Sequence, residues 1–146
     1  WYDSRMNHVK ADFRVFRSYT PFEIDNVRIT PVAVDHVRDT DGFLFEDMRR
    51  GKKIAYLSDL RGMPAQTANL VQDTDAVITD ATYLESDIHD DPTHFQKDQI
   101  VPFLDTLNSR EIILTNIGSY SGLTHVDLER KFPQYTIAYD GMRREY

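Results

Sequence analysis

Short apolar runs rich in β-branched and aromatic residues recur along the chain, each bounded by turn-forming or charged residues. Runs of this length and composition are typical of buried or half-buried strands. Pro31 interrupts one of them, and we expect that strand to lie at a sheet edge or a bulge because proline cannot donate to a ladder. The pattern predicts strand segments at residues 11–16, 22–24, 27–34, 42–46, 54–57, 75–80, 111–115 and 135–139.

Between the later runs the apolar spacing changes to that of helices. Pro64 occupies a first-turn position before a short predicted helix over residues 65–71. Thr93 and Gln96 match a capping box, which predicts a helix from His94 to about Leu107, kinked at Pro102.

A second capping box is formed by Thr124 and Asp127, and it predicts a helix that ends near Phe132. The first half of the chain therefore resembles a series of hairpins, and the second half alternates strand with helix. This order predicts the α/β class, with a mixed β-sheet and flanking helices.

Composition narrows the setting. The 146 residues suit one domain, and the absence of cysteine excludes disulfides and thiolate metal sites. No apolar run is long enough to span a membrane and the first residues lack the apolar core of a signal peptide, so we expect a cytoplasmic protein with no membrane partner. The net charge of −7 argues against bulk attraction of nucleic acid. We interpret the acidic stretch at residues 83–92 as a solvated loop rather than a metal cluster.

Polar residues follow four of the predicted strands, at His36, Asp59, Asp80 and Asn116. If these strands share one sheet and run in the same direction, the four side chains line one rim, where open α/β sheets bind ligands. His94 joins them at a predicted helix N-terminus, where unpaired N–H groups favour anions. Histidine and aspartate from separate strand ends suit a divalent metal such as Zn²⁺ or Mn²⁺.

The order of these segments resembles the second half of a metallo-β-lactamase-fold hydrolase. The similar branch of that family contains the phosphoribosyl cyclic phosphate phosphodiesterases, and the resemblance extends over about residues 22–144. It rests on five stretches in sequence order: Ile29-Thr30-Pro31-Val32-Ala33-Val34-Asp35-His36, Gly42-Phe43-Leu44-Phe45-Glu46, Ile54-Ala55-Tyr56-Leu57-Ser58-Asp59, Ile112-Ile113-Leu114-Thr115-Asn116-Ile117 and Ala138-Tyr139-Asp140-Gly141-Met142.

The resemblance implies the second αβ half of an αββα fold and a role for each rim residue. His36 matches a metal-ligand histidine, and Asp59 matches the aspartate that bridges two Zn²⁺ or Mn²⁺ ions. His94 matches a histidine near the scissile phosphate, as a proton donor or phosphate contact. Asp80 matches a polar position that supports the site without ligating. The implied substrate is a small phosphodiester or cyclic phosphate, with nucleic acid less favoured.

Two departures from the family pattern leave two hypotheses open. The family's His-x-His-x-Asp-His run is absent, and Asn116 stands where the family has a histidine, so we expect at most two metal ligands. Residues 1–146 are then either the C-terminal part of a longer hydrolase or a metal-free binding or interaction module that kept the fold. We also expect an uncovered apolar sheet face, leading to self-association or to pairing with a missing half.

Overall fold

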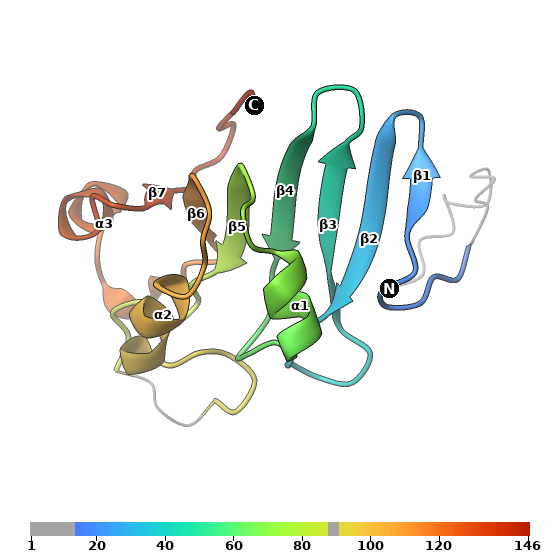
Figure 1. Cartoon of the computed structure of the whole chain (residues 1–146). Helices are drawn as coiled ribbons and strands as arrows, with labels where there is room; N and C mark the ends of the chain where they lie inside the picture. The colour runs from blue at the N-terminus through green and yellow to red at the C-terminus, as the bar shows by residue number, and fades with distance from the viewer. Residues whose placement is uncertain (1–13, 88–90) are drawn as a thin grey trace, which may run out of the picture.

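A computed structural model describes residues 14–87 and 91–146 as a mixed α/β fold built on one seven-stranded sheet, which confirms the predicted fold class. The strands follow the order of the sequence from one edge to the other (Figure 1). They are β1 (Phe22–Ile24), β2 (Val27–Ala33), β3 (Asp41–Asp47), β4 (Lys52–Leu57), β5 (Ala76–Asp80), β6 (Ile112–Thr115) and β7 (Thr136–Ile137). The helices are α1 (Ala65–Leu70), α2 (Lys97–Leu104), α3 (His125–Lys131) and the 3₁₀ turn η2 (Ser119–Ser121).

The direction of the strands decides which ends meet. β1 to β4 pair antiparallel, and β4 to β7 pair parallel. β2, β4, β5, β6 and β7 therefore all run the same way, and their carboxyl ends lie on one rim of the sheet. The parallel part is joined through α1, α2 and α3, as crossover connections require.

One face of the sheet is covered by helices, with α1 and α2 lying across it in Figure 1. Leu44, Ala55 and Val77 are register partners on neighbouring strands, and each is at most 2% exposed. They belong to one apolar core with helix residues such as Ile100 and Leu104. Alternate strand positions thus form the core, because side chains alternate between the two faces of a sheet.

Among the described residues, the opposite face of the sheet carries apolar side chains that are partly exposed to solvent. Phe43, Tyr56 and Ile78 are register partners across three strands on this face, and Tyr56 is 39% exposed. At the β1 edge, Phe22 and Ile24 are 38% and 56% exposed. These five residues define what we call the open face, which agrees with the expectation of an uncovered apolar sheet face.

The predicted edge position of Pro31 is wrong, because β2 lies between β1 and β3. β1 is so short that its pairing ends at Phe22 opposite Ile29. Pro31 therefore lies beyond β1, where its carbonyl accepts a hydrogen bond from the Tyr19 N–H (2.7 Å). Of the strand predicted at residues 11–16, residues 14–16 are irregular and residues 11–13 lie outside the described part of the chain.

The predicted start of the second helix is also wrong. α2 begins at Lys97 after Gln96, whose N–H donates to the Gln99 side chain (3.0 Å). Thr93 does not cap the helix, because its N–H and its hydroxyl both donate to the Asp91 carboxylate (2.7 and 2.5 Å). A capping box needs the Thr93 N–H to donate to the side chain at N3, but here it donates to the ionised Asp91 carboxylate, so Thr93 ends a turn instead.

The third predicted helix is confirmed as α3, including its cap. The Asp127 N–H donates to the Thr124 hydroxyl oxygen (3.3 Å), and the Asp127 carboxylate accepts from the Thr124 N–H (3.1 Å). Within the described residues, no helix is both long enough and apolar enough to cross a membrane.

We expect the Val77→Ala change to lower the free energy of unfolding by about 2 kcal/mol, because it removes two methyl groups from a closed core. Val126→Ala is the matched control, since Val126 lies on α3 and is 57% exposed. Its effect should stay within about 0.5 kcal/mol. Urea unfolding of both variants measures the difference, and equal effects would contradict the core assignment.

Candidate metal centre

The structure brings the strand-end residues to one rim, as their parallel direction requires. His36, Asp59 and Asn116 each follow a strand, and Asp80 is the last residue of β5. The segments after β2 and β4 also pair with each other, because the Asp35 N–H donates to the Gly62 carbonyl (2.9 Å). This bridge places His36 beside the segment that carries Asp59.

Gly62 is needed for that close approach. A Cβ atom at this position would lie 3.1 Å from the Asp35 carboxylate oxygen, closer than such contacts usually are. The glycine that ends the polar turn after β4 therefore lets the two rim segments meet.

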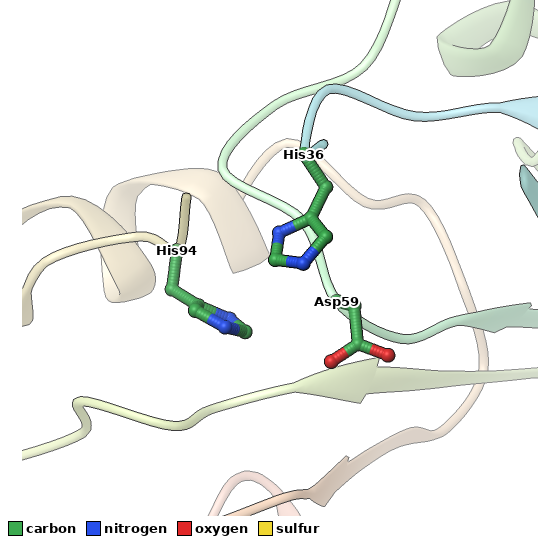
Figure 2. Close-up of side chains that lie close together, drawn as sticks. All are labelled: His36, Asp59 and His94. Atoms are coloured by element: carbon green, nitrogen blue, oxygen red, sulfur yellow. The ribbon is translucent and has the colours of Figure 1, made fainter. Parts of the chain in front are cut away.

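Three side chains converge at this rim from three separate segments (Figure 2). The potential ligand atoms of His36, Asp59 and His94 all lie within 4.8 Å of one another. Across residues 14–87 and 91–146, no other group of three such ligands is found. His94 lies in the segment that precedes α2, and not in the first turn of a helix.

His36 is held in one tautomer by the backbone. Its Nδ1 lies 2.8 Å from the Thr93 carbonyl oxygen. A carbonyl can only accept, so Nδ1 carries the proton and donates it to this bond. The remaining nitrogen, Nε2, is then unprotonated and able to bind a metal.

His94 is held in the same tautomer by a carboxylate. Its Nδ1 contacts Oδ2 of Asp80, whose side chain is only 2% exposed. The other Asp80 oxygen accepts from the Thr82 N–H and hydroxyl (2.7 and 2.5 Å). The buried carboxylate is thereby fully satisfied and rigid, and it leaves Nε2 of His94 facing the site.

Asp59 and Asn116 are joined through one hydroxyl group. The Ser58 hydroxyl donates to Asp59 (3.1 Å) and accepts from the Asn116 side-chain amide (3.0 Å). Both residues have left-handed backbone conformations, with φ values of 54° and 53°. Asp and Asn tolerate this region better than other side chains, and it turns the chain sharply at the strand ends.

The donor set fits a divalent metal. Two imidazole nitrogens and one carboxylate are the ligand types of catalytic zinc sites. Donors on one tetrahedral Zn²⁺ lie about 3.3 Å apart. Because the ligand atoms are spread over up to 4.8 Å, small side-chain rotations would be needed for all three to hold one ion.

The segment 91–96 is organised by Asp91. Its carboxylate accepts from Thr93, as above, and from the Tyr83 hydroxyl (2.7 Å). These hydrogen bonds, led by that of the Thr93 side chain, lower the pKa of Asp91 to about 2. The bond to Asp91, with burial, raises the pKa of Tyr83 to about 12. The described part of the acidic loop is thus used in hydrogen bonds rather than in a metal cluster.

The fold is a mixed α/β sheet, and histidine and aspartate side chains at its carboxyl rim form a candidate divalent-metal site. The family model described as the β-lactamase superfamily domain matches residues 2–117, and the chain belongs to this family. No significant match was found among curated proteins.

Solved structures share the fold. A diphosphatase of the PhnP family is 26% identical with a TM-score of 0.71, and the match covers 89% of this chain and 47% of that chain. Zn²⁺-bound PqqB from Methylobacterium extorquens is 17% identical with a TM-score of 0.71, over 91% of this chain and 52% of that one. The metallo-β-lactamase fold protein YhfI from Bacillus subtilis is 14% identical with a TM-score of 0.66, over 87% and 53%. The chain therefore spans about half the length of these structures.

We expect Asp91→Asn to lower the free energy of unfolding by about 1 kcal/mol at pH 7, because a charge-assisted acceptor is lost. Because folding lowers the pKa of Asp91, its ionised carboxylate stabilises the fold at pH values above its ordinary pKa near 4. This contribution disappears as the pH falls through about 2. Urea midpoints of the variant and the parent chain should differ by the same amount at pH 7, 5 and 4. The difference should be smaller at pH 3. A difference that widens on acidification would contradict the assignment.

Proposed function

We propose that this chain supplies part of the active site of a metal-dependent hydrolase, and that its substrate is a small phosphodiester or cyclic phosphate. The observation that carries the proposal is the convergence of His36, Asp59 and His94 within 4.8 Å. Each of the three has a second hydrogen-bonding group behind it. A cluster of this kind at the carboxyl rim of the sheet is where ligands bind in such folds.

In this proposal His36 and Asp59 hold Zn²⁺ or Mn²⁺, in a dinuclear site in the whole protein. His36 offers a neutral Nε2, and Asp59 offers two carboxylate oxygens. Such ions, when bound, make a water molecule nucleophilic and stabilise the developing charge on phosphate oxygens. The Ser58 hydroxyl fixes the rotamer of Asp59, which lowers the cost of ordering it on binding.

His94 is proposed to serve the phosphate group as a proton donor or contact. The helix start that first suggested this role is not at His94, so the support now comes from Asp80. His36 has a neutral carbonyl behind its ring, whereas His94 has a buried carboxylate. A carboxylate behind an imidazole stabilises the positive charge that forms when the ring takes up a proton. His94 can then donate that proton through Nε2 to a leaving oxygen.

The proposed substrate class draws support from the family and from one structure. The PhnP-family protein that is 26% identical over most of this chain is described as a diphosphatase. Hydrolysis at a phosphate oxygen is common to diphosphates, phosphodiesters and cyclic phosphates, and it needs the same kinds of groups.

The second candidate is a metal-free binding or interaction module. Asn116 favours it, because its amide group donates to Ser58 and an amide is a weak ligand for zinc. A donor set of two or three groups from this chain leaves a metal weakly bound. Metal binding by the chain separates the two hypotheses directly.

For the metal test we expect isothermal titration with Zn²⁺ and Mn²⁺ to show weak binding to the parent chain. His36→Ala and Asp59→Ala should both abolish it. His94→Ala should leave metal binding in place and, in the complete enzyme, lower turnover of a chromogenic phosphodiester by roughly 10²–10⁴-fold.

His125→Ala is the matched control, since His125 lies on α3 and pairs with Glu129 (3.2 Å). It should change neither binding nor turnover. Loss of metal in His94→Ala would make His94 a ligand instead of a proton donor. Absence of binding by the parent chain would favour the metal-free module.

We also propose that the open face packs against a second αβ unit, from another copy of the chain or from further chain. The support is its exposed aromatic and aliphatic residues, since contiguous exposed apolar patches often mark association surfaces. The matched structures also contain about as much chain again as the match covers.

If this is correct, sedimentation of the isolated chain should show dimers or larger species that dissociate on Ile24→Lys or Tyr56→Lys exchange. Ile24→Lys places a charge at the edge of the open face, and Tyr56→Lys places one at its centre. Val126→Lys, on the exposed side of α3, is the control and should not alter association. A monomer that binds no hydrophobic dye would rule out the proposed packing.

A further inference from the structure

The segment from Asp91 to Gln96 touches both histidines of the candidate site. His94 belongs to it, and the carbonyl of the preceding residue, Thr93, accepts the hydrogen bond that fixes His36. One residue therefore connects the two rings, whose centroids lie 4.8 Å apart. The position of Thr93 sets both the tautomer of His36 and the point from which His94 enters the site.

Asp91 fixes the position of Thr93. Its Oδ1 atom accepts from both the N–H and the hydroxyl of Thr93, at 2.7 and 2.5 Å. The segment is also held elsewhere, since Arg61 donates to the Pro92 carbonyl (2.8 Å) and the Gln96 side chain donates to the Asp91 carbonyl (2.7 Å). Those bonds hold the backbone of the segment on either side of Thr93, whereas the N–H and the hydroxyl of Thr93 itself both donate to the Asp91 carboxylate.

Tyr83 links the same carboxylate to the ring of His94. Its hydroxyl donates to the other Asp91 oxygen (2.7 Å), and its ring meets the His94 ring edge-on, with centroids 5.9 Å apart at 85°. The hydroxyl bond thereby fixes the aromatic wall against which His94 packs. The lowered pKa of Asp91 and the raised pKa of Tyr83 agree with a charge-assisted bond at neutral pH.

We infer that Asp91 is a positioning residue for the site: through Thr93 and Tyr83 it holds His36 and His94 so that both present Nε2 to the same space. The effect on metal binding rests on the proposed function, whereas the effect on the two imidazoles does not. Outer groups that orient metal-binding histidines are usually worth 10- to 100-fold in metal affinity.

The experiment compares Asp91→Ala with Asp87→Ala. Asp87 has a 93% exposed side chain 3.6 Å from Lys97, so its removal makes the same charge change without touching the histidines. Long-range ¹H–¹⁵N NMR spectra of the metal-free chain read the tautomer of each histidine. The parent and Asp87→Ala should show His36 and His94 as single Nδ1–H tautomers.

Asp91→Ala should convert the His36 ring to a tautomer mixture, shift the signals of the His94 ring, and weaken Zn²⁺ binding by about 10- to 100-fold relative to Asp87→Ala. Tyr83→Phe keeps the ring contact and removes only the hydroxyl bond. It should disturb the spectrum of His94 more than that of His36, and it serves as the deciding variant if Asp91→Ala does not fold.

Spectra of Asp91→Ala, or of Tyr83→Phe in its place, that match those of Asp87→Ala would overturn the inference. A parent chain that binds no Zn²⁺ would refute the proposed metal site alone, because the tautomers are measured without metal. The two failures are therefore distinguishable.

Discussion

The common direction of β2, β4, β5 and β6 is the constraint on which the candidate site depends. The side chains at their ends belong to residues 36, 59, 80 and 116, which are far apart in the chain. Parallel pairing nevertheless brings the carboxyl ends of β4, β5 and β6 to one rim. β2 reaches the same rim because two antiparallel steps through β3 restore its direction. A parallel crossover in place of either hairpin, β2–β3 or β3–β4, would send His36 to the opposite end of the sheet from Asp59.

Parallel strands bring the residues near one another, but hydrogen bonds behind the side chains determine which atoms face inward. His36 is backed by a carbonyl, His94 by a buried carboxylate, and Asp59 by a hydroxyl. The groups behind His36 and His94 come from other segments of the chain. The hydroxyl behind Asp59 belongs to the adjacent residue, Ser58, in the turn where Asp59 has a positive φ. A site arranged in this way loses little conformational freedom when it binds a ligand, because the ordering has already occurred on folding.

Much of this arrangement could be predicted from the sequence, because the signals were local. The apolar runs predicted the strands from β1 to β7, and the strand-end residues predicted the rim. The capping box at Thr124 predicted α3, since both partners lie within four residues. The same signal failed at Thr93, because the Asp91 carboxylate accepts from the N–H that the capping box needs and no periodicity reveals which partner is preferred.

The remaining features depend on contacts between distant residues, which spacing cannot show. Pro31 predicts an edge strand, but the inner strand β2 tolerates it because β1 ends before reaching Pro31, and spacing cannot show the length of β1. The expectation of two ligands, His36 and Asp59, stays a prediction, but spacing could not show that His94 lies beside them because it comes from the segment before α2. The bond from His36 to Thr93 joins residues 57 positions apart, and the one from Tyr83 to Asp91 joins residues 8 positions apart. The pattern Asp91-Pro92-Thr93-His94 was the available signal, because an aspartate two residues before a threonine commonly accepts from its N–H.

The open face and the small donor set have a common physical explanation under the proposed function. Among the described residues, a sheet covered on one side by α1 and α2 leaves Phe22, Ile24 and Tyr56 exposed to water, which is unfavourable at about 25 cal/mol for each Å² of apolar surface. In that proposal the same rim supplies two metal ligands, His36 and Asp59, whereas a closed dinuclear site needs more. A second layer packed on the open face would cover the apolar residues, and its own strand ends would lie beside the rim that carries His36 and Asp59. Packing and metal affinity should then rise together, so association and tight metal binding would be two measurements of one event.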